Sequence, residues 1–260
     1  MAHYETGSGR VNDIAAFSDA CARNGTMGLV DAVSSLGVAN FSIDDYPGIA
    51  AWASCPQKGI CCLPLTYAPV SFTDSYIKTL NKSGARTFVH HPVLEARHWG
   101  IIDGVDAEQG TYHRTHSAYA VAAFHEALRL TLSEGLAVRA DRYAYHEGAM
   151  RSALEALGCK VTSNMTSLLV LNLPDSMAGS EAELVKRCRE RGFGIWTTLS
   201  KPVQIRIGIL NQLEPAAVTD IITRFAQAMQ EMNAIVKPQD ASNALNTYYQ
   251  LQNKPEPVAA

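Results

Sequence analysis

The chain has 260 residues, of which 47% are hydrophobic and 18% charged, and its formal net charge at pH 7 is −3. This balance gives no electrostatic reason to expect a nucleic acid or an anionic membrane surface as a partner. No apolar run approaches the roughly 20 residues that a membrane-spanning helix needs. The first six residues also lack the basic and apolar segments of a secretory signal. We therefore expect a globular protein with a substantial core.

Six cysteines are scattered along the chain without Cys-x-x-Cys spacing, and several have apolar neighbours. They are Cys21, Cys55, Cys61, Cys62, Cys159 and Cys188. In a chain of this size that shows no leader, this usage is typical of reduced, mostly buried thiols. We expect a cytoplasmic protein without structural disulfides.

The first elements predict an α/β sheet. Residues from Asn12 to Gly25 predict a capped helix, and residues 26–30 predict a short strand that ends at Asp31. Strand, helix and strand in succession imply parallel pairing. Ligands of such sheets bind beyond the carboxyl ends of the strands, which is where Asp31 falls.

The remaining segments alternate between helical and extended patterns. Extended pieces are predicted at 60–65, 68–72, 167–173, 193–197 and 203–209, and helices at 73–80, 118–134, 136–158, 180–192 and 215–232. Residues 81–114 read as irregular. We expect a partial α/β large domain over 1–135, a linking helix over 136–158, a small α+β domain over 159–236 and a loose tail over 237–260.

Two charged residues in short polar segments indicate cofactor chemistry. Asp31 precedes a small-residue segment, and Lys58 ends the run from Ser54. A pyridoxal phosphate enzyme needs a lysine amine to form a Schiff base and a carboxylate to keep the pyridine nitrogen protonated. Alone, Asp31 reads as a turn cap and Lys58 as a solvated surface lysine. Together, and in this order, they favour a pyridoxal phosphate site.

Several motifs resemble class V aminotransferases of the fold-type-I pyridoxal phosphate superfamily. Among these are alanine–glyoxylate, serine–pyruvate, pyridoxamine–pyruvate and 2-aminoethylphosphonate–pyruvate transaminases. Residues 3–9 are similar to the family's H-x-E-[ST]-[ST]-[ST]-G loop, 112–115 to its Y-H-x-T motif and 204–208 to its R-I-G strand. With the Asp31 and Lys58 segments, the resemblance covers the chain from residue 3 to about residue 232. It implies a fold-type-I large domain followed by a small α+β domain.

The resemblance implies cofactor roles for four residues. Lys58 would be the Schiff-base lysine and the proton shuttle between the substrate Cα and the cofactor C4′. Asp31 would pair with the pyridine nitrogen. Thr6 would contact the cofactor near its ring hydroxyl, and Gln57 would contact its phosphate.

The resemblance also implies roles for three further residues. Tyr112 and Thr115 would reach the phosphate of the neighbouring subunit's cofactor, so the resemblance implies a dimer with shared sites. Their alternative role is a helix N-terminus, with Thr115 or Ser117 as the cap. Arg206 would clamp the substrate carboxylate in a bidentate fork. Its alternative is an intramolecular ion pair.

A metal site is the competing interpretation of the histidines. His90, His91 and His98, or His113 and His116, have compatible spacing, but no carboxylate or thiol cluster completes a site in the sequence. We therefore expect no metal.

Two departures from the family pattern matter. After the lysine the family has a Pro-Pro-Gly-like turn, where this chain has Leu65, which cannot easily adopt a positive φ. Family members also begin with a longer N-terminal segment that carries a phosphate loop and an aromatic residue stacked on the pyridine. We expect weak cofactor retention by this chain alone.

We expect a pyridoxal phosphate-dependent aminotransferase that transfers an amino group between a small amino acid and a 2-oxo acid. It would act as a homodimer, or as the lysine-bearing subunit of a split enzyme whose partner chain completes the site. The alternatives are a catalytically silent or truncated partner subunit and another pyridoxal phosphate reaction, such as an elimination or a decarboxylation. The sequence does not identify the amino donor or acceptor.

Overall fold

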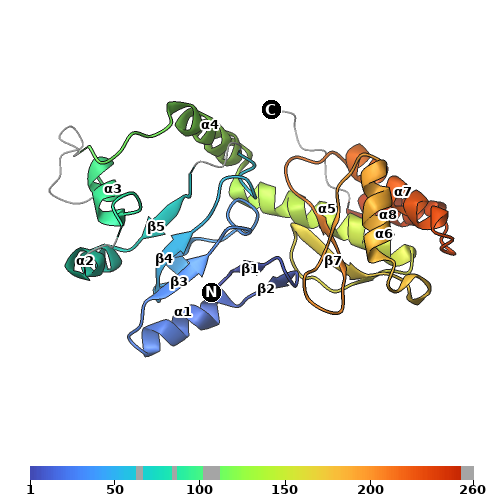
Figure 1. Ribbon diagram of the computed structural model, residues 1–260, viewed down its shortest axis with the longest axis horizontal. Helices are drawn as coiled ribbons and strands as arrows, with labels where there is room; N and C mark the ends of the chain where they lie inside the picture. The colour runs from blue at the N-terminus through green and yellow to red at the C-terminus, as the bar shows by residue number, and fades with distance from the viewer. Residues whose placement is uncertain (63–66, 84–86, 102–111, 253–260) are drawn as a thin grey trace.

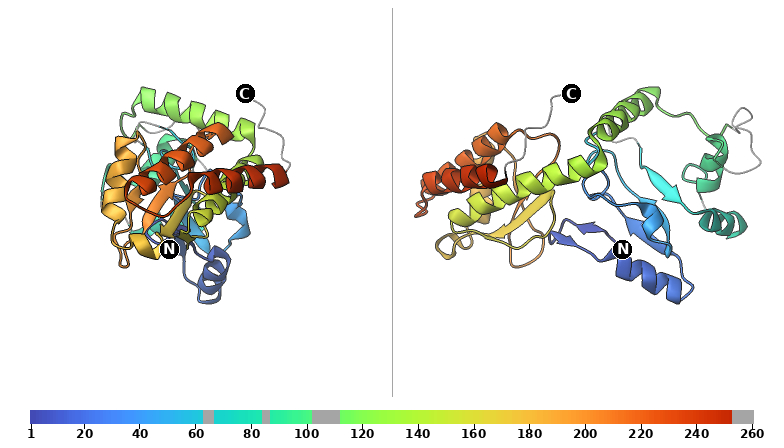
Figure 2. Two further views of the ribbon diagram at one scale, coloured as in Figure 1. Left: turned by 90° about the vertical axis from the view of Figure 1, so that its right-hand side faces the viewer. Right: turned by 180° about the vertical axis from the view of Figure 1, so that it is seen from behind.

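The chain folds into two lobes joined by a long helix (Figure 1). The computed structural model describes residues 1–62, 67–83, 87–101 and 112–252. One lobe carries a small mixed sheet with α1, α2 and α3. The other carries an antiparallel sheet together with α6, α7 and α8, and α5 runs from one lobe into the other (Figure 2).

The first lobe is built on a three-stranded sheet in the order β3-β4-β5, formed by Gly28–Asp31, Ile49–Ala53 and Val70–Phe72. The parallel pairing that we predicted holds between β3 and β4, whereas β5 runs antiparallel to β4. Helix α1 (Ile14–Arg23) begins after Asp13, whose carboxylate accepts the Ala16 N–H at 2.9 Å. Strand β4 was not predicted, because a strand buried over four successive residues shows no alternation and its alanines have low strand propensity.

A hairpin at the N-terminus connects the two lobes. Strands β1 (Tyr4–Glu5) and β2 (Arg10–Val11) pair antiparallel. The Val11 N–H donates to the Asn164 side-chain oxygen at 2.8 Å, and the Asn164 N–H donates to the Gly9 carbonyl at 2.9 Å. A Cβ on Gly9 would lie 2.6 Å from the Ser163 Cβ, so this close approach requires glycine.

Three helices follow the first sheet: α2 (Asp74–Ser83), α3 (Pro92–His98) and α4 (Ala118–Glu134). Helix α3 lies in the segment that we predicted to be irregular. It is too short to show a periodic apolar pattern, and its start is fixed by Pro92 and by His91 Nδ1, which accepts the Leu94 N–H at 3.3 Å. The predicted extended piece at 60–65 forms no strand over 60–62, and its remainder lies outside the described residues.

The second lobe holds the main hydrophobic core. Its sheet has the order β6-β7-β9-β8, formed by Lys160–Val161, Leu168–Asn172, Ile205–Gly208 and Trp196–Thr197, with every pair antiparallel. Helices α5 (Leu136–Ala156), α6 (Glu181–Glu190) and α7 (Pro215–Glu231) pack on it. The largest fully buried side chains of this core include Tyr143, Met150, Leu154, Leu169 and Phe225.

The predicted loose tail is wrong over residues 238–252, which form helix α8 (Pro238–Gln252). Ala241 and Leu245 of α8 are fully buried, and a Cβ on Gly148 of α5 would lie 2.0 Å from the Tyr248 hydroxyl oxygen. The helix is thus held by close packing against α5. Its Asn and Gln residues mask a narrow apolar stripe in the sequence. Residues 253–260 lie outside the described part of the chain.

Candidate cofactor and substrate site

Asp31 lies where β3 ends, beyond the carboxyl edge of the sheet. Its Oδ1 accepts the Val33 N–H at 2.8 Å, so the residue does cap the following turn. The side chain remains exposed. The turn-capping role therefore leaves carboxylate oxygen lone pairs available to another partner.

The segments that follow β3 and β4 pack backbone against backbone. The Ala32 N–H donates to the Ala53 carbonyl at 2.7 Å, and the buried Ser54 hydroxyl donates to the Ala32 carbonyl at 3.0 Å. A Cβ on Gly59 would lie 2.1 Å from the Leu36 carbonyl oxygen, so only glycine fits there. This contact fixes the turn that carries Lys58, here called the lysine loop (residues 54–62), against the turn that follows Asp31.

Lys58 is half-buried in the lysine loop. The Cys61 N–H donates to the Lys58 carbonyl at 3.0 Å, and the Cys62 N–H donates to the Pro56 carbonyl at 2.8 Å, so the backbone of the loop is internally bonded. Within the described residues, the Lys58 ammonium has no hydrogen bond or ion pair. The amine is therefore held on a defined backbone without an internal partner.

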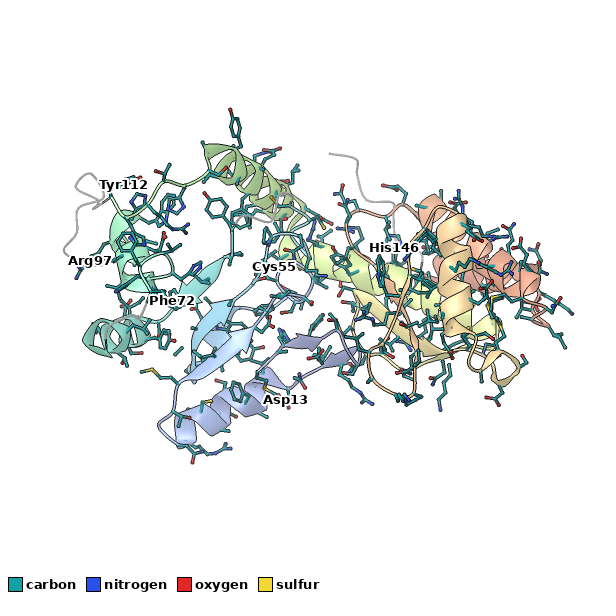
Figure 3. All side chains as sticks on the ribbon, in the orientation of Figure 1. Asp13, Cys55, Phe72, Arg97, Tyr112 and His146 are labelled. Atoms are coloured by element: carbon teal, nitrogen blue, oxygen red, sulfur yellow. The ribbon has the colours of Figure 1, made fainter. Side chains whose placement is uncertain are left out.

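The Cys55 thiol lies in the lysine loop, and the charges of Lys58 and Asp31 both affect its pKa. Burial raises the pKa of its thiol, while backbone N–H groups of Lys58 and Gln57 and the Lys58 charge lower it, and the Asp31 charge raises it. The thiol also approaches the Val33 carbonyl oxygen at 3.8 Å. Because the thiol contacts the Val33 carbonyl, the lysine loop lies beside the turn that follows Asp31. Figure 3 labels Cys55 near the centre, between the lobes.

The Gln57 side chain has unused hydrogen-bonding capacity. Its Oε1 atom is buried and has no partner among the described residues. A buried polar atom without a partner costs about 1–3 kcal/mol, so such an atom points to a missing ligand or water.

Arg206 and Thr6 contact each other although they are 200 positions apart in the sequence. Arg206 lies on β9 between Val170 of β7 and Trp196 of β8, and its Nη1 donates to the Thr6 carbonyl oxygen at 3.2 Å. Its Nε is buried without a partner, and no carboxylate pairs with it in the described residues. The predicted alternative, an intramolecular ion pair, is therefore not seen in the described part of the chain, and donors of the guanidinium remain free.

Tyr112 and Thr115 are not brought to the lysine loop. Their hydroxyl groups form a hydrogen bond with each other, and Tyr112 is 68% exposed. Figure 3 labels Tyr112 at the outer end of the first lobe, well separated from Cys55. The cap of α4 is Ser117, whose hydroxyl accepts the Ala120 N–H at 3.4 Å, so one of the two candidate caps is confirmed.

A carboxylate that we did not pair with the histidines lies among them. Glu95 forms an ion pair with Arg114, and its oxygens lie 3.7 Å from His113 Nε2 and 3.4 Å from His116 Nε2. Burial opposes ionisation of Glu95, but the hydrogen bond and charge of Arg114 and the two imidazoles hold its pKa below the usual value. In the described ranges no set of three suitable side chains forms a metal site.

A second buried charge cluster, missed in the sequence, lies at the junction of α4 and α5. Glu134 accepts hydrogen bonds from Arg139 Nη1 at 2.5 Å and from Arg142 Nε at 2.6 Å. Both arginines are less than 10% exposed, at 5% and 7%. Arg139 also donates to the Gly37 carbonyl oxygen at 2.8 Å and to that of Gly59 at 2.5 Å. Arg139 therefore connects the cluster to both site loops.

Removal of the shared carboxylate should destabilise the fold in a pH-dependent manner. Burial opposes ionisation of Glu134, but the two guanidinium groups hold its pKa below the usual value. Its contribution to stability is therefore complete above the ordinary glutamate pKa of about 4.3 and is lost as the pH falls through the lowered value. We expect Glu134→Gln to lose about 3 kcal/mol of unfolding free energy at pH 7. The difference from the native chain should shrink below about pH 4.

Urea unfolding of both chains at pH 7 and at acid pH measures this difference. A loss of equal size at both pH values would mean that the ionised carboxylate is not what stabilises the cluster.

Comparison with known proteins agrees with the fold described above. No family model matches the chain. The (S)-ureidoglycine–glyoxylate transaminase of Bacillus subtilis is 24% identical over 75% of this chain and 50% of its own length. A 2-aminoethylphosphonate–pyruvate transaminase of Pseudomonas aeruginosa is 22% identical over 90% of this chain and 62% of its own length. The crystal structure of a ureidoglycine–glyoxylate aminotransferase from Bacillus subtilis superposes with a TM-score of 0.86 at 21% identity, covering 96% of this chain and 64% of that one.

The chain has the fold of the fold-type-I pyridoxal phosphate aminotransferases, as predicted. It spans 50% to 62% of the length of these curated relatives. Its homologues are class V aminotransferases, the family that the sequence motifs indicated. None of the described helices has the length and apolar character needed to cross a bilayer.

Proposed function

We propose that this chain carries the lysine-bearing part of an aminotransferase site, which transfers an amino group between a small amino acid and a 2-oxo acid. The observation that carries the proposal is the packing of the lysine loop against the turn after Asp31. The relatives' names include transfers to glyoxylate and to pyruvate, which are both small 2-oxo acids.

The residues present fit pyridoxal phosphate as the cofactor. When bound, this cofactor accepts electron density from the substrate Cα. The Asp31 carboxylate is exposed and would pair with the pyridine nitrogen, and the Lys58 amine would bind the cofactor carbonyl. Gln57 would contact a phosphate oxygen through its side-chain N–H donors, and Thr6 would lie near the ring hydroxyl.

Lys58 would also move the proton in the reaction. The free ε-amine of Lys58 would accept the proton from the substrate Cα and would release it again. No ion pair or hydrogen bond occupies the Lys58 amine within the described residues, so the amine is available for this role. The bonded backbone of the lysine loop would hold the amine in place while the proton is transferred.

Arg206 would bind the substrate carboxylate. A guanidinium group offers two parallel N–H donors to a carboxylate, and the Arg206 Nε has no other partner in the described chain. Its contact with the Thr6 carbonyl would orient the side chain.

We further propose that Tyr112 and Thr115 act on the cofactor phosphate of a neighbouring subunit in a homodimer. Their separation from the lysine loop in one chain supports this arrangement (Figure 3). We also propose a cytoplasmic location, because the six cysteines are scattered without Cys-x-x-Cys spacing.

The test is a product balance with the protein incubated with pyridoxal phosphate. We expect one equivalent of a new amino acid from glyoxylate or pyruvate for each equivalent of 2-oxo acid formed from the donor. Ammonia release without a new amino acid would indicate an elimination, and carbon dioxide release a decarboxylation. No product from any small amino acid would indicate a catalytically silent chain.

A further inference from the structure

Arg139 contacts the backbone on both sides of the candidate site. It is 5% exposed and reaches from α5 to the carbonyl oxygens of Gly37 and Gly59. Gly59 directly follows Lys58, and Gly37 ends the small-residue segment after Asp31. No other side chain in the described part of the chain donates to both carbonyls.

Arg139 donates to both of these carbonyls, and the Gly59 carbonyl also accepts the Cys61 thiol at 3.6 Å. Gly37 and Gly59 approach so closely that a Cβ on Gly37 would lie 2.9 Å from the Gly59 carbonyl carbon. Two carbonyl dipoles that point to the same place are stabilised by one cation between them. Because the guanidinium is planar and has fixed donor directions, it also fixes the angle between the two loops.

Glu134 and Tyr143 hold Arg139 itself in place. Glu134 accepts from its Nη1, and the guanidinium carbon lies 5.8 Å from the centroid of the Tyr143 ring. Tyr143 is completely buried, and burial raises the pKa of its hydroxyl to about 12, so the ring stays neutral. Arg139 is therefore held in one position on α5 and is not a mobile surface cation.

We propose that Arg139 is a positioning residue for Lys58: it sets where the ε-amine lies relative to the Asp31 carboxylate by holding the Gly37 and Gly59 carbonyls together. The expected effect of Arg139 on catalysis rests on the proposed function. The positioning itself depends only on contacts within this chain. A loosened lysine loop should lower the specific reactivity of Lys58, since small misplacements of a reacting group cost about 10- to 100-fold.

Arg142 provides the matched control. It is 7% exposed, shares Glu134 with Arg139 and lies 5.0 Å from the Tyr143 ring centroid, but its carbonyl partner is Asn211, outside both loops. Arg139→Met and Arg142→Met therefore remove equivalent buried cations, and only Arg139→Met releases the lysine loop. Arg139→Lys retains a charge and enough donors to reach one carbonyl.

Two measurements on the full chain test the proposal. The first is hydrogen exchange at the Cys61 and Cys62 amides, which close the lysine loop on the Lys58 and Pro56 carbonyls. The second is borohydride trapping of pyridoxal phosphate at Lys58, quantified by peptide mass spectrometry. We expect Arg139→Met to speed exchange and to reduce trapping at Lys58 about 10-fold or more. Arg139→Lys should retain part of the native exchange protection and part of the native trapping at Lys58. Arg142→Met should change the exchange rates and the trapping by no more than about twofold.

The outcomes separate the two proposals. Equal effects of Arg139→Met and Arg142→Met, or native exchange at Cys61 and Cys62 in Arg139→Met, would overturn the positioning role. If Arg139→Met does not fold, Arg139→Lys against Arg142→Lys decides the same question. If the native chain is not trapped at Lys58, the proposed function fails, while the exchange comparison still decides whether Arg139 holds the loop.

Discussion

Lys58→Ala should abolish amino transfer while leaving the fold intact. The side chain is half-buried and has no hydrogen bond or ion pair in the described residues, so its removal costs little stability. It would nevertheless eliminate both the covalent attachment of the cofactor and the proton transfer at the substrate Cα. The proton transfer alone is worth about 10²- to 10⁴-fold in rate. Single-turnover formation of the 2-oxo acid, with thermal unfolding as a check on the fold, measures the effect.

Lys186→Ala is the control for this variant, because Lys186 is an exposed lysine on α6. It should transfer amino groups at the native rate. Added methylamine should restore part of the activity of Lys58→Ala, since a small amine can replace the missing proton acceptor. Activity of Lys58→Ala within tenfold of the native chain would disprove the assigned role.

Arg206→Ala should raise KM for amino-acid donors far more than it lowers kcat. The lost interaction is a charge-assisted pair with the substrate carboxylate, worth about 2–3 kcal/mol. This corresponds to an increase in KM of about 30- to 150-fold. Steady-state kinetics with alanine as donor measures the change, and comparison with an amine that lacks a carboxylate isolates it. The variant should lose its preference for the carboxylate-bearing donor.

Arg206→Lys tests the geometry of the same contact. It keeps the positive charge on β9 but loses the paired N–H donors, so we expect an intermediate KM. If Arg206→Ala leaves KM unchanged while an activity is measurable, Arg206 does not bind the substrate carboxylate. The unpartnered Nε of Arg206 then has another ligand.

The two charged loops of the site could be predicted because their signals lie within short stretches of sequence. Asp31 follows a short apolar strand and Lys58 lies in a turn-rich segment, and both positions depend on neighbours within a few residues. The α/β pattern indicated parallel pairing, but the strand that pairs with β3 and brings the loops together, β4, was not predicted. The close contact of Gly59 with the Leu36 carbonyl then completes the arrangement, and glycine is the only residue that fits there.

The features that the sequence did not indicate depend on contacts between distant segments. Arg139 lies in the predicted linking helix, yet it reaches carbonyls 102 and 80 positions away. Glu95 lies in a segment too short to show helical periodicity, although it neutralises Arg114. Helix α8 was missed because two buried residues, Ala241 and Leu245, are a weak signal among Asn and Gln. Only the folded chain reveals such partners.

Under the proposed function, one amine of this chain, that of Lys58, binds pyridoxal phosphate opposite the Asp31 carboxylate. Incubation with the cofactor, borohydride reduction and peptide mapping measure this directly. We predict that the phosphopyridoxyl group is found on Lys58 at low cofactor concentration, that Lys186 stays unmodified, and that Asp31→Ala weakens the labelling. Labelling spread evenly over Lys58 and Lys186, and unchanged by Asp31→Ala, would contradict the account.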